Sequence, residues 1–174
     1  MRARHKHRIF WAVACASFAL DQITKLAAQR ALVVGGVPRG KLTVLRRVLS
    51  FKYGWNTGGP FSLFFGQNHL LILFSVLAAA AVIAWFLMLK DVSRLQVVAL
   101  ALVAGGALGN LCDRVFLGKV RDFVNLELIH TVTGYQWPIF NVADVSICLG
   151  VGLMVVVLLG PSKASRPDQA GASS

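Results

Sequence analysis

Four long apolar segments dominate the pattern of hydrophobic and polar positions along this chain. A helix that crosses a bilayer needs about 20 consecutive, mostly apolar residues. The apolar segments that approach this length cover residues 9–28, 69–89, 95–113 and 141–160. The pattern therefore predicts an all-α polytopic membrane protein with four transmembrane helices.

The segments that connect these helices have a different periodicity. In SFKYGWN, the aromatic residues Phe51, Tyr53 and Trp55 alternate with small or polar residues, and a period of two favours a half-buried strand. The stretches DFVNLELI and YQWPIF flank a turn signal at residues 130–134, which predicts a hairpin. We expect these strands to form a small β platform on one face of the membrane.

Composition supports a single membrane domain. The chain has 174 residues, of which 56% are hydrophobic, and its mean hydropathy of +0.67 is too high for an ordinary soluble domain. We assign residues 1–162 to one domain with long connections at 30–68 and 114–138. Residues 163–174 are rich in small and polar residues, which predicts a disordered tail. The N-terminus resembles a cleavable signal peptide, but Asp21 and Lys25 follow its apolar run, so we expect an uncleaved first helix.

The strong positive charge points to lipid and not to nucleic acid. The net charge is +11, with 18 lysines and arginines, but these lie in the N-terminal tail and the connections instead of on one helical face. Anionic head groups of membrane lipids are the expected partners. Four basic residues among the first eight favour a cytoplasmic N-terminus. Residues 30–68 carry six more, so the numbers of positive charges on the two sides of the membrane are nearly equal. Four crossings place both termini on the same side, whichever way the protein faces.

Neither cysteine nor histidine spacing predicts a metal site. Cys15, Cys112 and Cys148 fall in predicted helices without a CxxC pair. The histidines form no ligand cluster, and His5 and His7 lie in a basic tail that we expect to be solvated. We predict no metal and no cofactor.

Polar residues from distant parts of the sequence map to one membrane face. They lie near the exit of the first and third helices, in the long connections, and at the entry to the fourth helix. These residues are Asp21, Lys25, Asn56, Asn110, Asp113, Arg114, Asp122, Asn141 and Asp144. Convergence of this kind indicates a built site.

Two motifs in this set also have purely structural interpretations. In DQITK, Asp21 and Lys25 have the i,i+4 spacing of a helical ion pair, which needs no function at the end of a helix. In GGALGNLCDR, Gly105 and Gly109 have the spacing that lets helices pack closely. The following Asn110, Asp113 and Arg114 are expected to hold one another in a single network.

Asp122 and Asp144 are the candidates for chemistry. Asp144 heads an apolar stretch without a local basic partner, and a carboxylate in such a place usually has a function. Lys119 or Arg121 could pair with Asp122 at the surface, which is the alternative for that residue. Two carboxylates a few ångströms apart share one proton, so that one acts as a base for water and the other as an acid for a carbonyl. This is the logic of aspartic proteolysis.

These motifs resemble those of the lipoprotein signal peptidase family, also called signal peptidase II, of bacterial inner membranes. The matching stretches are DQITK, WNTGGPFSL, GGALGNLCDRVFLGKVRDFVN and FNVADVSICLG, and the resemblance runs from about residue 9 to residue 160. By resemblance, Asp122 and Asp144 are the catalytic aspartates. The resemblance also implies supporting or substrate-contacting roles for Asp21, Lys25, Asn56, Gly106, Asn110, Asp113, Arg114 and Asn141.

The resemblance further implies an activity and a location. The substrates would be prolipoproteins that carry diacylglycerol on a cysteine, cleaved just before that cysteine. The site would lie on the periplasmic side of the inner membrane, with both termini in the cytoplasm. Two departures concern the platform: Gly59-Pro60 stands where the family has small residues, which stiffens the loop, and the segment at 130–134 is slightly long.

Other classes of protein have less support from the sequence. The chain has no GxSG, GxGD or HExxH motif of other intramembrane proteases. A small proton-coupled transporter or a non-enzymatic membrane subunit remains the alternative, with Asp21, Asp113 and Asp144 as a proton relay. A transporter should carry its acids near the bilayer midplane, whereas here they gather at one face.

Overall fold

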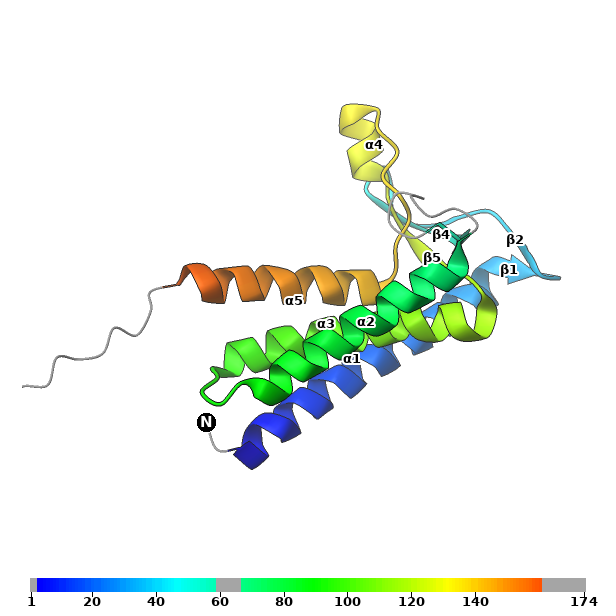
Figure 1. Cartoon of the computed structure of the whole chain (residues 1–174). Helices are drawn as coiled ribbons and strands as arrows, with labels where there is room; N and C mark the ends of the chain where they lie inside the picture. The colour runs from blue at the N-terminus through cyan, green and yellow to red at the C-terminus, as the bar shows by residue number, and fades with distance from the viewer. Residues whose placement is uncertain (1–2, 59–66, 161–174) are drawn as a thin grey trace, which may run out of the picture.

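The computed structural model describes residues 3–58 and 67–160 and places four long helices side by side (Figure 1). Each is long and apolar enough to cross a membrane. They are α1 (Ala3–Leu32), α2 (Asn68–Met88), α3 (Arg94–Leu117) and α5 (Val142–Leu159). The predicted number and order of the helices are confirmed, and α1 is longer than the apolar pattern indicated.

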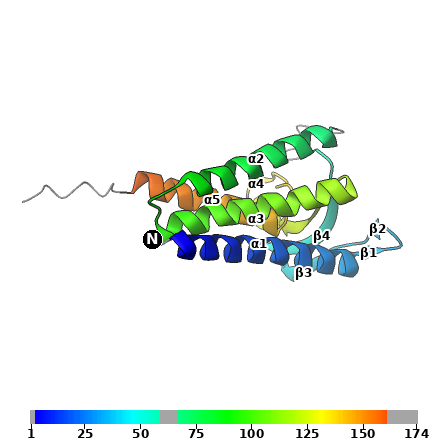
Figure 2. The same ribbon diagram turned by 60° about the horizontal axis from the view of Figure 1, so that its bottom comes forward.

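Helix α3 is the centre of the bundle and packs against α1, α2 and α5 (Figure 2). Its glycines permit the close approach of two neighbours. A Cβ atom added to Gly105 would lie 2.5 Å from the carbonyl oxygen of Ala14 in α1, and one added to Gly106 would lie 2.5 Å from that of Ala143 in α5. The close packing predicted for this glycine-rich stretch is therefore confirmed.

The basic N-terminal segment is part of α1 and is partly buried, so the expected solvation is wrong for His7. The His7 ring meets the Phe86 ring edge-on at 5.1 Å. Lys6 is only 6% exposed and donates a hydrogen bond of 2.5 Å to the carbonyl oxygen of Leu89. The reason is local: the backbone continues the helix to Ala3, which brings these side chains onto the end of α2.

Two small antiparallel sheets lie at the opposite end of the bundle from the N-terminus (Figure 1). One pairs β1 (Val33–Val34) with β2 (Val37–Pro38), and the other has the order β3 (Leu42–Leu45), β4 (Leu49–Asn56), β5 (Val120–Leu126). The strand predicted from SFKYGWN is confirmed as β4. Its aromatic residues pack with Ala28 and Leu32 of α1 and with Phe123 of β5, which fixes the sheet to the end of the bundle.

The second predicted hairpin is wrong. DFVNL forms strand β5, but the next residues form a short helix, α4 (Glu127–Thr133), that ends at Gly134 with a φ of 74°. One edge of β5 is already paired with β4, and Phe140 contributes only an isolated bridge to Val124. Within α4, Thr131 and Thr133 donate to backbone carbonyls four residues earlier, which satisfies their hydroxyl groups in a helix.

Two expectations fall outside the described residues. Gly59-Pro60 and the tail at 163–174 both lie in ranges that the structure does not describe.

Candidate active site

Asp122 and Asp144 come from different elements and meet at the junction of the sheet and the bundle. Asp122 lies in β5, opposite Gly54 of β4. Asp144 lies in the first turn of α5, where Asn141 is the N-cap. The Asn141 side chain accepts from the backbone N–H of Asp144, while the Asp144 side chain accepts from the backbone N–H of Asn141. This capping box fixes the direction of the Asp144 carboxylate.

Side-chain and backbone amides surround both carboxylates. Asp122 accepts from Asn141 Nδ2 at 2.6 Å and from Asn56 Nδ2 at 3.0 Å. Asp144 accepts from Asn110 Nδ2 at 2.8 Å and from the Asn141 backbone at 3.1 Å. Asn141 thus bonds to both acids, so the convergence that the sequence predicted is real for these five residues.

The surroundings of Asp122 favour its protonated form. This residue is 2% exposed. Burial and, to a lesser extent, the nearby negative charge of Asp144 raise the pKa of the Asp122 carboxyl to about 7, although the hydrogen bonds from Asn56 and Asn141 lower it. At neutral pH, Asp122 is therefore able to exchange a proton, as a general acid or base must.

Within residues 3–58 and 67–160, Asp122 forms no ion pair with a basic residue, so the surface pair with Lys119 or Arg121 is wrong. Neighbouring residues of a strand point to opposite faces, and Arg121 therefore turns away from Asp122. Its Nε donates to Asp113 Oδ2 at 3.1 Å. Lys119 instead places its ammonium 4.0 Å from the centre of the Trp55 ring.

The single network expected for Asn110, Asp113 and Arg114 is also wrong. Successive residues of an α-helix are about 100° apart around its axis, so Asp113 and Arg114 face different neighbours. Asp113 binds Arg121 and Lys25. Arg114 instead lines a cavity beside Asp122 and Asp144, and its Nε has no hydrogen-bond partner among the described residues.

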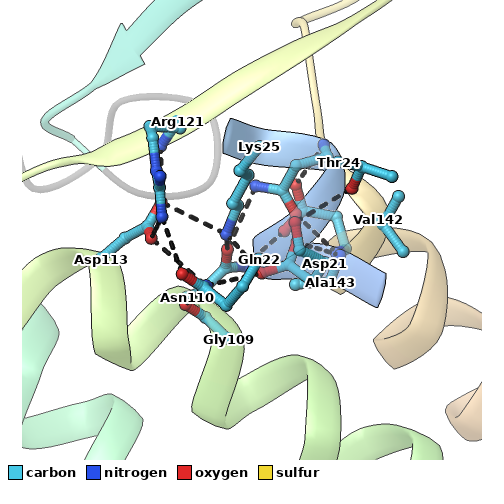
Figure 3. Close-up of polar contacts among 12 residues, drawn as sticks. Asp21, Gln22, Thr24, Lys25, Gly109, Asn110, Asp113, Arg121, Val142 and Ala143 are labelled. Atoms are coloured by element: carbon cyan, nitrogen blue, oxygen red, sulfur yellow. Dashed lines mark hydrogen bonds and ion pairs between the residues drawn. The ribbon is translucent and has the colours of Figure 1, made fainter. Parts of the chain in front are cut away.

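Asp21 and Lys25 form the predicted ion pair, but it is much more than a pair at a helix end. Both side chains are completely buried, and Lys25 Nζ lies 2.8 Å from Asp21 Oδ2 and 3.3 Å from Asp113 Oδ2. The same ammonium donates to Asn110 Oδ1 at 2.9 Å (Figure 3). Asp21 also accepts from the backbone N–H of Ala143 at 2.9 Å, which ties α1 to the start of α5.

Two members of this cluster were missed by the sequence analysis. Gln22 donates to the Gly109 carbonyl at 3.1 Å and accepts from Arg121 Nη2 at 2.7 Å. The sequence contained a signal that could have identified Gln22 as a site residue, because it is a polar residue in the same helical turn as Asp21. Arg121 was considered only for Asp122, and the alternation of side chains along a strand would have directed it to the other face.

A cavity of about 1020 Å³ opens beside the two carboxylates. Its walls are mainly apolar and come from α2, α3, α5 and the segment before α5; they include Leu71, Ala78, Ala107, Ile139 and Val145. The polar groups in its lining are Asn56, Ser75, Asn110, Arg114, Asp122 and Asp144. A long apolar ligand can thus lie against the bundle with one polar segment beside the acids.

No group of three histidine, cysteine or acidic side chains in the described ranges has the arrangement of a metal site. Cys15, Cys112 and Cys148 are free thiols. The absence of a metal requirement stays a prediction from the sequence.

A bundle of membrane-spanning helices with two adjacent carboxylates beside an apolar cavity has the features of an aspartic peptidase of the membrane. Residues 13–160 match the family model described as signal peptidase (SPase) II. The chain belongs to this family, as its motifs indicated.

Individual relatives agree with the family model over nearly the whole chain. A lipoprotein signal peptidase of Geobacter sulfurreducens is 39% identical over 92% of this chain and 98% of its own. One from Methylobacterium sp. is 41% identical over 90% and 94%. A solved bacterial membrane enzyme, determined by the in meso method at 2.3 Å resolution, has a TM-score of 0.76 at 27% identity, with 93% of this chain and 94% of the other covered. A transporter or a non-enzymatic subunit is not favoured.

Proposed function

We propose that this protein removes the signal peptide from diacylglyceryl-modified prolipoproteins by cleaving the bond before the lipidated cysteine. The observation that carries the proposal is the pair Asp122 and Asp144, joined through Asn141 at the edge of the apolar cavity. Membership in the signal peptidase II family supports it. A signal helix and two acyl chains are soluble only in the bilayer, so the enzyme has to meet them there.

In the proposed reaction, protonated Asp122 donates a hydrogen bond to the carbonyl oxygen of the scissile bond, while ionised Asp144 takes a proton from water. The resulting hydroxide attacks the carbonyl carbon. The tetrahedral intermediate then collapses, and the leaving nitrogen of the cysteine takes a proton from Asp144. Asp144 thus first accepts a proton and later donates it, while Asp122 keeps its proton and donates a hydrogen bond, so the pair shares one proton as in aspartic proteases.

The charges around the site agree with one proton on the pair. Seven charged groups of the described residues belong to the buried ion-pair cluster or to the cavity lining: Lys25, Arg114, Arg121, Asp21, Asp113, Asp122 and Asp144. Three cations thus face four carboxylates. One proton on the catalytic pair makes the whole group neutral, which lowers the free-energy cost of burying it.

The apolar cavity is the proposed binding site of the signal peptide and its lipid. The cavity walls offer hydrocarbon to the acyl chains and the signal helix, while Arg114 and Asn110 face the polar peptide segment. The Arg114 guanidinium, which lines the cavity, would donate to a substrate carbonyl oxygen. Asn56 and Asn141 hold Asp122 in place, and Gly106 lets α5 approach α3.

We also propose the location and the domain bounds. The sheet end of the bundle faces the periplasm, and both termini face the cytoplasm of a bacterial inner membrane, which the basic N-terminus supports. Residues 1–162 form the peptidase domain. The chain without residues 163–174 should then cleave as the full chain does.

The test is cleavage of a diacylated prolipoprotein peptide by detergent-purified protein, with an unlipidated peptide in parallel. Asp122→Asn and Asp144→Asn should each lower kcat by at least about 10²-fold because a general acid or base contributes about 10² to 10⁴. The double variant should be hardly worse than either, since the two act as one unit. Activity should persist in EDTA.

Asp91→Asn is the matched control, because Asp91 is exposed at the other end of the bundle, and it should leave turnover unchanged. Thermal melts show whether each variant is folded. If folded Asp122→Asn or Asp144→Asn cleaves at the wild-type rate, that aspartate is not catalytic. If the wild type cleaves neither peptide, the assigned activity is wrong.

A further inference from the structure

The side-chain amide of Asn110 lies between a buried ammonium and the two proposed catalytic carboxylates. Its Oδ1 accepts from Lys25 Nζ at 2.9 Å and from Asn141 Nδ2 at 3.1 Å. Its Nδ2 donates to Asp144 Oδ1 at 2.8 Å. The amide thus presents opposite ends to Lys25 and to Asp144, and its orientation decides whether Asp144 receives a donor.

Lys25 is the group that can fix this orientation. An ammonium only donates, whereas an amide offers an oxygen at one end and N–H groups at the other. If the Asn110 amide turned by 180°, its Nδ2 would face the ammonium and its Oδ1 would face the Asp144 carboxylate. Both contacts would be repulsive, and three hydrogen bonds would be lost. With Lys25 in place, the Asn110 amide is therefore held in the orientation in which Nδ2 donates to Asp144.

Lys25 itself has no freedom to turn away. The side chain is completely buried, and its ammonium contacts Asp21, Asp113 and Asn110, one acceptor for each of its three protons (Figure 3). Both carboxylates are anchored in turn. Asp21 accepts from the backbone of Ala143, and Asp113 accepts from the backbone and the side chain of Arg121.

The effect continues from Asn110 to the second carboxylate. Asn141 Nδ2 donates to Asn110 Oδ1 and also to Asp122 Oδ1, at 2.6 Å. Lys25 holds the Asn110 oxygen in place, and this oxygen is an acceptor for Asn141 Nδ2. It thereby helps to keep the Asn141 amide in the orientation in which Nδ2 also donates to Asp122. The series of contacts runs from Lys25 through two amides to both acids.

We propose that Lys25 is a positioning residue for the peptidase reaction: it sets the direction of the Asn110 amide, and so supplies Asp144 with the donor that stabilises its ionised, water-activating form. Lys25 does not line the cavity, so its contact with Asp144 runs through Asn110, while its positive charge also acts directly on Asp122, whose pKa it lowers. This inference rests on the proposed function. A positioning role differs from a purely structural role in one measurable respect: loss of the donor at position 25 should change the pH dependence of turnover.

The test uses pairs of variants that keep the buried charges balanced. Lys25→Met combined with Asp21→Asn removes one cation and one carboxylate together. Lys25→Gln combined with Asp21→Asn restores an uncharged N–H donor on a side chain that is one bond shorter. Asp21→Asn alone is the reference, and the pH–rate profile of each is measured per folded protein on the diacylated peptide.

We expect the Lys25→Met pair to lower kcat by about 10- to 100-fold at neutral pH, which is less than the roughly 10²- to 10³-fold lost with a donor that contacts the transition state directly, because Lys25 reaches Asp144 through Asn110. KM should stay within about twofold because the cavity lining is unchanged. The acid limb of the profile should move to higher pH, since ionised Asp144 has lost its donor. The Lys25→Gln pair should recover part of both effects.

Gln22→Leu is the structural control. Gln22 contacts Asp21, Asp113, Arg121 and the Gly109 carbonyl but not Asn110, so this variant should lower Tm without moving the acid limb. If the Lys25→Met pair has the profile of its Asp21→Asn reference, or if Gln22→Leu moves the acid limb as far, the inference is overturned.

A further variant keeps the inference testable if the Lys25 pairs do not fold. Asn110→Asp retains an acceptor for Lys25 but offers no N–H to Asp144. It should fold, lose most of its kcat, and shift its acid limb upward. A wild-type profile would overturn the inference. An inactive wild type would instead refute the proposed function, so the two failures are distinct.

Discussion

The four buried or half-buried aspartates of this site differ in the kind of partner that they have. Asp21 and Asp113 are held by cations, Lys25 and Arg121. Asp122 and Asp144 accept from neutral amides instead. An amide holds a carboxylate in position without fixing its charge to the same degree. The partners therefore separate two ion-paired aspartates from the two to which we assign the chemistry in the proposed function.

Asp122 should make the stability of the protein depend on pH. Its pKa is raised from 3.8 to about 7 in the folded state, so between these values the folded protein holds a proton that the unfolded chain releases. Stability should thus be greatest at low pH in this window and fall as pH rises from about 4 to about 7. Asp122→Asn removes this contribution. The measurement is Tm in detergent at a series of pH values, as a difference between wild type and variant.

Asp91→Asn serves as the control for that measurement, because Asp91 is exposed and should leave the slope of Tm against pH as in the wild type. Parallel curves for wild type and Asp122→Asn would contradict the raised pKa.

At the residue scale, the sequence predicts contacts within one element better than contacts between elements. Asp21 and Lys25 could be paired because the i,i+4 spacing on a helix places them together. The pairing of Asp113 with Arg121 depends on β5 returning over the end of α3, which local spacing does not reveal. The same return places Arg121 and Asp122 on opposite faces, and this overturned the surface pair expected for Asp122.

Helix α3 determines how closely α1 and α5 approach one another at the candidate site. Gly105 faces α1, Gly106 faces α5, and a Cβ atom on Gly109 would lie 2.5 Å from Asp21 Oδ2. Neighbouring helices therefore reach the α3 backbone at three points. Because Asp144 lies in the first turn of α5, the small size of Gly106 also sets the position of that carboxylate.

Gly106→Ala should destabilise the protein and impair cleavage. The new methyl group would lie 2.5 Å from the Ala143 carbonyl oxygen and 2.9 Å from Ile147 Cγ1, so α5 would have to move at the turn that bears Asp144. Overpacking of this kind costs about 1–3 kcal/mol. Tm and the cleavage rate of the diacylated peptide should both fall.

Gly152→Ala is the matched control in α5, because a Cβ atom there meets nothing within 4 Å. It should leave activity unchanged and raise stability slightly, since alanine favours a helix by up to about 1 kcal/mol over glycine. Equal effects of the two substitutions would show that helix propensity and not packing is what matters at Gly106.

The long helices and β4 could be predicted because their hydrophobic periodicity is strong and local. Helix α4 could not, since Glu127–Thr133 has no long apolar stripe and its sequence fits a strand equally well. The tertiary context decides its structure. One edge of β5 is paired with β4, and the other edge forms only a single bridge, between Val124 and Phe140. Strand propensity alone does not contain this information.

At the scale of the whole molecule, the two ends of the bundle differ in chemistry. The first residues of α1 and the last residues of α5 lie at one end, and the sheets, α4 and the candidate site lie at the other (Figures 1 and 2). The sequence could predict this division, because four crossings in alternation place the exit of α1, the exit of α3 and the entry of α5 on the same side. The shape of the cavity needed the structure, since it depends on which side chains of α2, α3 and α5 face one another.

The direction of the bundle in the membrane can be tested by labelling single cysteines. Basic residues occur at both ends, so the charge rule alone gives a weak preference, while a peptidase that meets exported prolipoproteins should have its site toward the periplasm. In a background with Cys15, Cys112 and Cys148 replaced by alanine, Tyr135→Cys marks the site end and Asp91→Cys the opposite turn. Both positions are exposed.

An impermeant maleimide added to intact spheroplasts should label Tyr135→Cys and leave Asp91→Cys unlabelled. After lysis both should react, which shows that each thiol is accessible once the reagent reaches it. Each variant must also retain cleavage of the diacylated peptide, so that the labelled molecules are correctly folded. Labelling of Asp91→Cys alone from outside would mean that the site faces the cytoplasm, and the proposed orientation would be wrong.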